Sequence, residues 1–126
     1  MNLFSSFFGL KKRQQLRIAV KWSVDAHVPK TDGSVRFHTR DISLRGVRLE
    51  GDTSSAFQQV LFGDGEAHMQ LHLPGQPRAV DVRGKLKWGL DDAGAFTTGW
   101  RFTRLPRRIR KTLRLCIKDH AKTLDR

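Results

Sequence analysis

Apolar and polar residues alternate along most of this chain, which is typical of β-strands that bury one face. The longest alternating run covers residues 18–28, where every second residue from Ile18 onward is apolar. Turn-forming residues at 29–34 separate this run from the next one. The same pattern predicts five further strands, at 35–42, around Val47 and Leu49, at 67–73, at 80–90 and at 96–102.

Residues 51–65 are polar and glycine-rich, and we expect a loop there with at most one helical turn. Toward the C-terminus the period changes, because Leu105, Ile109, Leu113 and Ile117 recur at every fourth residue. This spacing predicts an amphipathic α-helix, and basic residues fill its other face. Six antiparallel strands followed by one helix indicate a mainly β fold, a barrel or a sandwich, with a C-terminal α-helix.

The positive charge of the chain is concentrated at its two ends. The 126 residues carry a net charge of +12, of which residues 1–17 contribute +4 and residues 105–126 contribute +6. This distribution suits a nucleotide, a nucleic acid, a membrane or an acidic protein surface, but it equally suits two solvated ends. The length fits one domain, which we place at 13–122, between an N-terminal segment at 1–12 and a tail at 123–126.

The first ten residues, Met1–Leu10, are uncharged and include three phenylalanines. A basic cluster at Lys11–Arg13 follows them, which is the reverse of the order in a secretory signal. The run is also too short to span a membrane. We expect this segment to pack on the domain or on a partner, or to be disordered; a weak contact of Met1–Lys12 with a membrane surface is the alternative.

The chain offers few of the residue clusters that enzymes and metal sites need. Cys116 is the only cysteine, so no intrachain disulfide can form, and a cytoplasmic location is expected. The five histidines are scattered, so neither a metal nor a cofactor is expected. No serine–histidine–aspartate order and no phosphate-binding loop occurs, so a binding domain is favoured over an enzyme.

Two arginines, Arg13 and Arg17, stand just before the first predicted strand in the spacing Arg-x-x-x-Arg. A guanidinium can hold phosphate oxygens, or the O6/N7 edge of guanine, through two hydrogen bonds. The same spacing also occurs at 36/40, 104/108 and 110/114, so the pair is a weak signal by itself. A solvated basic linker is the alternative interpretation.

A more specific motif is Asp41-x-Ser43-x-x-Gly46. A carboxylate can accept the N1–H and N2–H donors of guanine, a hydroxyl can bind a phosphate or a base edge, and glycine permits close approach. The turn of the predicted hairpin is centred near Thr31–Asp32, so residues whose numbers add to about 63 should face each other. Arg17 would then lie opposite residues near Gly46, which brings the two motifs together.

The two motifs resemble the signature of the PilZ domain family, over Arg13-Gln14-Gln15-Leu16-Arg17 and Asp41-Ile42-Ser43-Leu44-Arg45-Gly46. The resemblance covers about residues 10–120 and implies a six-stranded antiparallel β-barrel of PilZ type with cyclic di-GMP as its ligand. It also implies that the two arginines hold phosphates and guanine. Asp41, Ser43 and Gly46 would then line the base site. Further candidate contacts are Lys12, Arg40, Arg45 and Trp100.

Two of these positions leave the ligand stoichiometry open. Lys12 stands where many relatives carry a second arginine, and in the family this position bears on whether one ligand or a stacked pair is bound. Lysine cannot stack on guanine as arginine does. Arg45 stands where a small residue is common, and it either adds a phosphate contact or crowds the site.

We therefore expect a cyclic di-GMP receptor or adaptor whose N-terminal arginine segment changes conformation on binding and signals to an unidentified protein partner. Whether it is a monomer or a dimer stays open. The alternatives are a basic β-barrel that binds single-stranded nucleic acid and a PilZ module that only docks proteins. A nucleic-acid barrel needs exposed aromatic residues, whereas Trp22, Trp88 and Trp100 fall on the apolar phase of their strands and are expected in the core. No specific nucleic acid is therefore expected.

Overall fold

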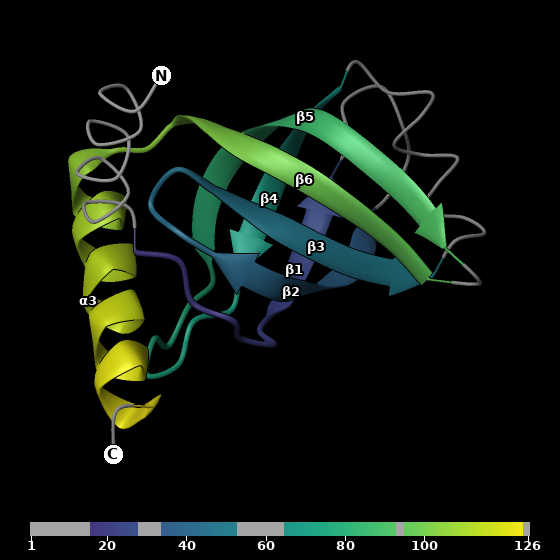
Figure 1. Ribbon diagram of the computed structural model, residues 1–126. Coiled ribbons are helices and arrows are strands. Elements are labelled where there is room, and N and C mark those ends of the chain that lie inside the picture. The colour runs from purple at the N-terminus through teal and green to yellow at the C-terminus, as the bar shows by residue number, and fades with distance from the viewer. Residues whose placement is uncertain (1–15, 28–33, 53–64, 93–94, 125–126) are drawn as a thin grey trace, which may run out of the picture.

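A closed β-barrel forms the body of the protein, and a long helix lies beside it (Figure 1). The structure is a computed structural model that describes residues 16–27, 34–52, 65–92 and 95–124. The strands are β1 (Ser23–His27), β2 (Val35–Ile42), β3 (Gly46–Asp52), β4 (Glu66–Leu71), β5 (Val80–Asp92) and β6 (Ala95–Arg104), and the helix is α3 (Arg107–Leu124).

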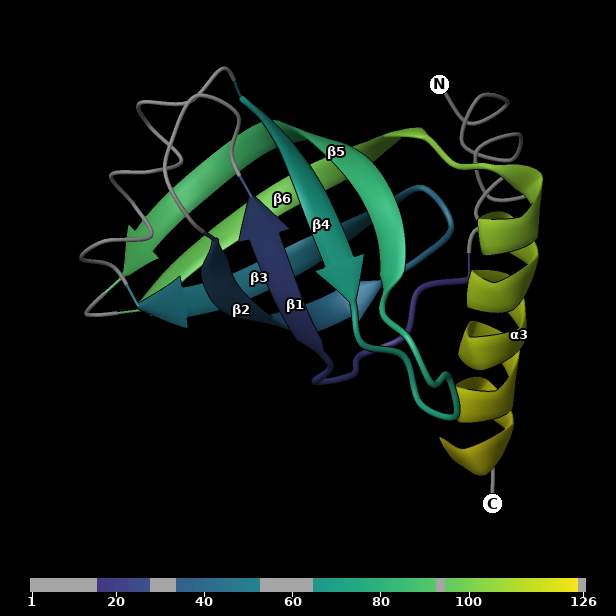
Figure 2. The ribbon, with the colours of Figure 1, turned by 180° about the vertical axis from the view of Figure 1, so that it is seen from behind.

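All neighbouring strands are antiparallel, in the order β1-β2-β3-β6-β5-β4, and β1 pairs with β4 to close the barrel. Figure 1 shows β3 and β6 toward the viewer, whereas Figure 2, turned by 180°, shows β1 and β4 toward the viewer. The β3–β6 pair and the β1–β4 pair therefore lie on opposite sides of the barrel. The predicted six-stranded antiparallel barrel with a C-terminal helix is confirmed.

In most of the barrel every second residue of a strand fills the interior, whereas in β6 the five residues 96–100 are all buried. In β4, for example, Ala67, Met69 and Leu71 are at most 1% exposed, and the residues between them face solvent. Burial of one large aliphatic side chain contributes about 1.5–3 kcal/mol to folding. The alternation of the sequence is therefore both the pattern of the strands and the source of the core.

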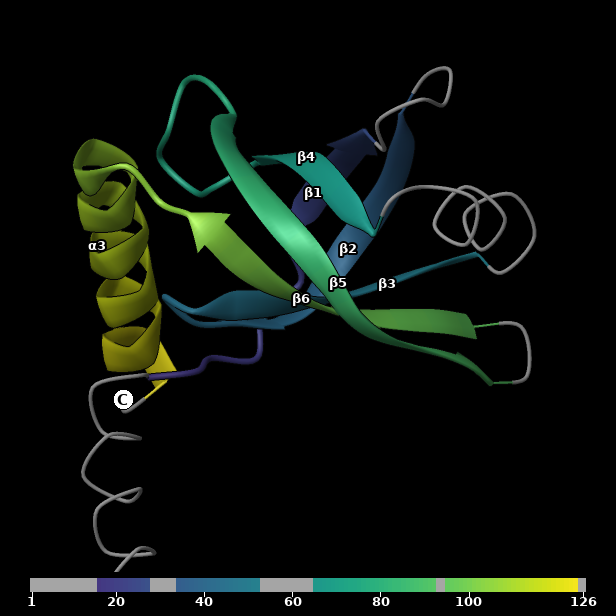
Figure 3. The same ribbon diagram turned by 90° about the horizontal axis from the view of Figure 1, so that it is seen from above.

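The helix α3 lies beside the barrel (Figure 3). It packs there through Leu113 and Ile117, which are 0% and 3% exposed. His120 meets the half-buried ring of Trp22 edge-on, with the ring centroids 6.4 Å apart. The carbonyl of Pro106 accepts a hydrogen bond from the Arg110 N–H at 2.8 Å, so proline starts the first helical turn. The predicted helix is confirmed, and its basic side faces solvent.

The predicted strand at 18–28 is only partly formed, because β1 begins at Ser23. Ahead of it the alternation of burial continues, and Val20 is 6% exposed. Thr39 of β2 explains the difference. Its hydroxyl donates to the Val20 carbonyl at 2.5 Å and accepts from the Trp22 N–H at 2.8 Å, so a side chain replaces part of the backbone ladder.

The register of the first hairpin also differs from the expected one. Facing residues of β1 and β2 add to 61, and ahead of β1 the bridge of Ile18 with Ile42 adds to 60, where about 63 was expected. Arg17 therefore lies opposite Ser43 rather than near Gly46. When the centre of the turn moves by one residue, the sum of facing residue numbers changes by two. The turn itself lies outside the described residues.

The prediction that Trp88 packs in the core is wrong, because its side chain is 43% exposed and that of Leu90 is 57% exposed. A β-bulge is the physical reason. Leu86 pairs with Trp100 and Trp88 pairs with Gly99, so inward and outward positions exchange between residues 86 and 88. Trp100, by contrast, is buried as expected, with 4% of its surface exposed.

Three predicted features lie outside the described residues: the segment 1–12, Arg13, and most of the loop expected at 51–65. In the described ranges, no helix is long and apolar enough to cross a membrane. The same ranges contain no group of three or more His, Cys, Asp or Glu side chains that could hold a metal ion.

Candidate functional site

Arg17 connects the two sequence motifs directly. Its guanidinium donates hydrogen bonds to the carboxylate of Asp41 and, at 3.4 Å, to the hydroxyl of Ser43. These partners lie 24 and 26 residues away in the sequence. Two backbone hydrogen bonds of 3.0 Å between Ile18 and Ile42 hold the two segments side by side. The structure thus brings together Arg17, Asp41 and Ser43.

A second arginine, Arg48 of β3, shares the carboxylate of Asp41. It stands directly opposite Asp41 in the ladder and donates to the other carboxylate oxygen. The Asp41 side chain is 7% exposed, whereas the side chains of Arg17 and Arg48 are each 42% exposed. The Nε of Arg48 is buried and has no hydrogen-bond partner among the described residues. A buried carboxylate therefore anchors two half-exposed guanidinium groups.

The negative charge of Asp41 is stabilised against the cost of its burial. Burial raises the pKa of the carboxyl, but hydrogen bonds from Arg48 and Arg17 outweigh this effect and hold the pKa below its ordinary value. The hydrogen bond to Asp41 in turn raises the pKa of Arg48. Asp41 is therefore ionised at neutral pH and holds both guanidinium groups beside one another.

The tight turn between β2 and β3 positions the rest of the second motif. The Ser43 N–H donates to the Gly46 carbonyl at 2.9 Å, and the Arg45 N–H donates to the Ser43 hydroxyl at 3.2 Å. A Cβ atom on Gly46 would lie 2.1 Å from the carbonyl oxygen of Trp100. Glycine is thus required here for the close approach of β3 and β6, and this requirement is independent of any ligand.

The register of the sheet aligns four residues across four strands. Asp41 faces Arg48, Arg48 faces Gly99, and Gly99 faces Trp88. Facing residues of antiparallel strands point to the same side of the sheet, and neighbouring strands are about 4.8 Å apart, so the row extends about 14 Å. The indole covers Gly99, where a Cβ atom would lie 2.2 Å from the Trp88 ring nitrogen.

A hollow of about 420 Å³ opens on the outer surface of the barrel over three residues of this row, Arg48, Gly99 and Trp88; Asp41 does not line it and adjoins it through Arg17 and Arg48. We call it the Arg17 hollow. Guanidinium groups and an exposed indole stand around it, which suits a ligand that carries both phosphates and aromatic rings. Its lining consists of Arg17, Val47, Arg48, Lys87, Trp88, Gly99 and Trp100.

The sequence motifs do not identify Arg48, Lys87 or Trp88, although a signal for Arg48 is present. The turn from Ser43 to Gly46 makes facing residues of that hairpin add to 89, which places Arg48 opposite Asp41. Such a turn is short enough for its register to be read from the sequence.

Of the remaining candidate contacts that the structure describes, only Trp100 lines the Arg17 hollow. Arg40 forms an ion pair with Glu50 at 3.6 Å, with 58% of its side chain exposed, and it does not line the Arg17 hollow. Arg45 is exposed at the turn and does not line it either. Trp100 lines the hollow although its ring is almost fully buried. Lys12 and Arg13 lie outside the described residues.

Comparisons with known proteins agree on one family and one fold. The family model for the PilZ domain matches residues 11–119. The PilZ domain with c-di-GMP of YcgR from Escherichia coli is similar in structure, with a TM-score of 0.68 and 14% identity over 91% of this chain and 98% of that one. No curated protein sequence matches the chain.

Two longer proteins share the fold. MrkH from K. pneumonia, in a c-di-GMP complex, has a TM-score of 0.69 and 14% identity, covering 90% of this chain and 53% of its own. The Bacillus subtilis inhibitor of motility, MotI/DgrA, has a TM-score of 0.67 and 14% identity, covering 87% of this chain and 52% of its own. The chain therefore spans about half the length of these two proteins.

Proposed function

Because the chain belongs to the PilZ domain family, we propose that it is a receptor for cyclic di-GMP. The observation that carries the proposal is the contact of one guanidinium, that of Arg17, with both Asp41 and Ser43. The YcgR and MrkH structures that share this fold contain c-di-GMP, which supports the choice of ligand. The proposal extends to any longer protein that contains this domain.

Arg17 has the donors that such a ligand requires. A guanidinium carries five N–H donors, and Arg17 uses one N–H of each terminal nitrogen, on Asp41 and on Ser43. The remaining donors and the exposed part of the side chain are available for a phosphate or for the Hoogsteen edge of guanine. We assign Arg13 the corresponding role from the other end of the Arg-x-x-x-Arg motif.

Asp41 acts on the ligand through its arginines as well as through its own oxygens. Its carboxylate offers about four lone-pair sites, so it can keep Arg17 and Arg48 in place and still accept the N1–H and N2–H donors of guanine. Ser43 is 2% exposed, so its hydroxyl serves a ligand only where Arg17 moves aside.

Trp88 supplies an aromatic surface at the other end of the same row. An exposed indole stacks on a purine, and such stacking is worth about 1–3 kcal/mol per base in nucleic-acid complexes. The row of about 14 Å from Asp41 to Trp88 can accommodate a dinucleotide. Single-stranded nucleic acid is a poorer fit, since Trp88 is the only exposed phenylalanine or tryptophan among the described residues.

We infer that binding changes the position of the segment that contains Arg13 and Arg17. A ligand shifts a conformational equilibrium only through unequal affinity for the two states, and one that binds Arg17 competes with Asp41 and Ser43 for the same donors. The bridge between Ile18 and Ile42 fixes the chain just after Arg17. Residues 1–17 would therefore reorient against the barrel and present a changed surface to a protein partner.

Hydrogen exchange measures this step. Saturating cyclic di-GMP should change the exchange of residues 1–17 and leave the amides of Ile18 and Ile42 unchanged, because those amides stay in the bridge. Unchanged exchange throughout residues 1–17 would contradict the conformational step without affecting the assignment of the ligand.

Calorimetric titration tests the ligand and the site separately. Arg17→Ala removes charged hydrogen bonds worth about 1.5–3 kcal/mol, so the affinity for cyclic di-GMP should fall about tenfold to a hundredfold. Arg36→Ala is the matched control, because Arg36 binds the carboxylate of Asp25 at 2.6 and 2.9 Å outside the Arg17 hollow. No heat with the wild type would refute the ligand, and equal affinity in Arg17→Ala would refute the site.

A further inference from the structure

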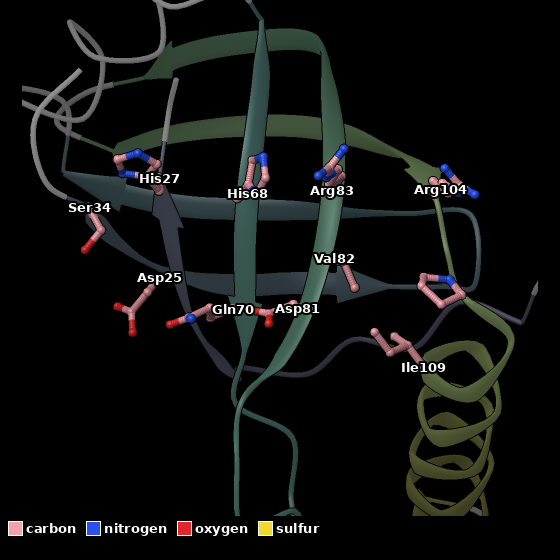
Figure 4. A pocket seen from close by; sticks show the side chains of 11 residues that line it. Asp25, His27, Ser34, His68, Gln70, Asp81, Val82, Arg83, Arg104 and Ile109 are labelled. Atoms are coloured by element: carbon pink, nitrogen blue, oxygen red, sulfur yellow. The ribbon is translucent and has the colours of Figure 1, made fainter. Parts of the chain in front are cut away.

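A second hollow lies over β1, β4 and the first residues of β5, whereas the Arg17 hollow lies over β3, β6 and a later part of β5. The second hollow has a volume of about 650 Å³, which is within the range of small-molecule sites. The outer faces of β1, β4 and β5 form its floor, and the start of α3 forms one wall (Figure 4). It shares no lining residue with the Arg17 hollow, so cyclic di-GMP does not account for it.

Four basic side chains form a row along this second hollow. His27 faces His68, His68 faces Arg83, and Arg83 faces Arg104, across four successive strands of the barrel. All four are exposed, and Figure 4 shows them in a line along one edge of the floor. With neighbouring strands about 4.8 Å apart, the row is about 14 Å long.

The pairing of Arg83 with Arg104 is unfavourable in the protein alone. Like charges that stand directly opposite in a sheet repel each other. Within the described part of the chain, neither arginine forms an ion pair with a carboxylate, and the next outward pair along the ladder, Lys85 and Arg101, repeats the conflict. A bound anion would remove the repulsion, so the pair is better suited to a complex than to an empty surface.

A second row, two residues further along the strands, has different chemistry. Asp25 faces Gln70, and Gln70 faces Asp81, about 6.6 Å from the basic row. Asp25 already binds Arg36 and His72, which leaves the amide of Gln70 and the carboxylate of Asp81 to accept or donate hydrogen bonds. These carboxylates would repel a long polyanion such as a nucleic acid, but they suit the hydroxyl groups of a small ligand.

We propose that the second hollow binds a small phosphorylated sugar or polyol. Its phosphate lies on the row of Arg83, Arg104 and His68, and its hydroxyl groups bond to Gln70 and Asp81. Pro106 and Ile109 at the start of α3 cover its carbon skeleton. The proposal is independent of cyclic di-GMP binding.

A nuclear magnetic resonance titration of the full chain with glucose 6-phosphate tests the proposal. Saturable shifts are expected for the amides of His68, Gln70 and Arg83, and Arg83→Gln should weaken the affinity at least about tenfold. Lys111→Gln, which removes the same charge from the exposed side of α3, is the control and should leave the affinity unchanged. The absence of saturable shifts, or an equal loss in the control, overturns the proposal.

Two further measurements separate the contribution of the phosphate from that of the sugar and test whether the two hollows are independent. Inorganic phosphate should bind more weakly than glucose 6-phosphate, and Asp81→Asn should weaken the sugar phosphate but not the free phosphate. Equal affinity for both probes overturns the assignment of a sugar. Cyclic di-GMP should not displace glucose 6-phosphate, and displacement would contradict two separate sites.

The melting temperature of the ligand-free protein measures the repulsion between Arg83 and Arg104, and it also shows that the Arg83→Gln variant folds. Without any ligand and at low salt, Arg83→Gln should raise the melting temperature by about 2 °C, because the like-charge pair is gone. A lower melting temperature would show that Arg83 stabilises the empty barrel, and this would overturn the reason for expecting an anion.

Discussion

Replacing Asp41 by asparagine measures how much the ion pairs of this carboxylate with Arg17 and Arg48 contribute to the free energy of unfolding. Asparagine has the same size and keeps one oxygen acceptor, so the packing around position 41 is preserved and the charge alone is lost. Arg17 and Arg48 then lie beside each other with no counter-charge from Asp41. Removing one partner of a fully buried ion pair costs about 3–5 kcal/mol, whereas an exposed pair is worth about 0–1 kcal/mol.

The structure places this network between those limits. The carboxylate is 7% exposed and therefore nearly desolvated, but each arginine side chain is 42% exposed and is screened by water. We therefore expect Asp41→Asn to lower the free energy of unfolding by about 2 kcal/mol at pH 7. Urea denaturation followed by tryptophan fluorescence measures it, with an unchanged slope in urea showing that the variant still unfolds in one step.

Asp25→Asn is the matched control. Asp25 also binds two basic side chains, Arg36 and His72, but its carboxylate is 22% exposed and Arg36 is 58% exposed. The greater exposure predicts a loss below about 1 kcal/mol. Equal losses in the two variants would refute the idea that burial makes Asp41 the more important carboxylate.

The pH dependence gives a second check with a definite sign. The pKa of Asp41 is lower in the folded protein than in the unfolded chain, so its stabilisation is complete above the unfolded value of about 3.9 and disappears as the pH falls through the folded value. The difference in stability between wild type and Asp41→Asn should therefore be constant from pH 7 to about 5 and shrink below about pH 4. A difference that grows on acidification would contradict the assigned ion pairs.

Three further predictions concern Gly46, Trp88 and Cys116. Gly46→Ala places a methyl group 2.1 Å from the Trp100 carbonyl oxygen, so it should cost at least about 2 kcal/mol and lower the melting temperature, whereas Arg45→Ala at the exposed neighbouring position should not. Trp88→Ala should lower the free energy of unfolding by about 1–2 kcal/mol, less than the about 3–5 kcal/mol of a fully buried tryptophan, because the residue is 43% exposed, yet weaken cyclic di-GMP at least about tenfold in calorimetry. Burial, and secondarily Asp119, raises the pKa of the Cys116 thiol, so iodoacetamide should alkylate it more slowly at pH 8 in the folded protein than in urea; equal rates would contradict this.

The alternation of apolar residues is sufficient to predict the six strands, because a strand with one buried face must repeat with a period of two. It also predicts that Arg17 approaches Asp41, since any short hairpin between the first two strands brings those segments together. The register of the first hairpin, by contrast, cannot be read from the sequence. The turn composition at 29–34 does not fix how many residues form the loop, and no pattern in the sequence shows that the Thr39 hydroxyl replaces a backbone partner.

Trp88 illustrates a conflict between two patterns in one strand. Its phase with Leu86 predicts that it points into the core, but the ladder that starts from the pairing of Asp92 with Ala95 places it opposite Gly99, which alternates with the buried Trp100. The two requirements cannot both hold in a regular strand. The bulge between residues 86 and 88 satisfies each in turn, at the expense of leaving a large aromatic ring in water.

Trp88 is 43% exposed and so forgoes part of the about 1.5–3 kcal/mol that full burial of a large apolar side chain contributes, which means that the fold keeps this ring on its surface against its own stability. Here the ring lies at one end of the row that begins at Asp41, over a glycine that leaves room for it. Replacing Gly99 by any larger residue would push the ring away from Arg48 and the Arg17 hollow. The bulge, Gly99 and Trp88 therefore place an aromatic surface at the same hollow as the guanidinium groups of Arg17 and Arg48, a combination that suits a base-containing ligand better than the arginines alone.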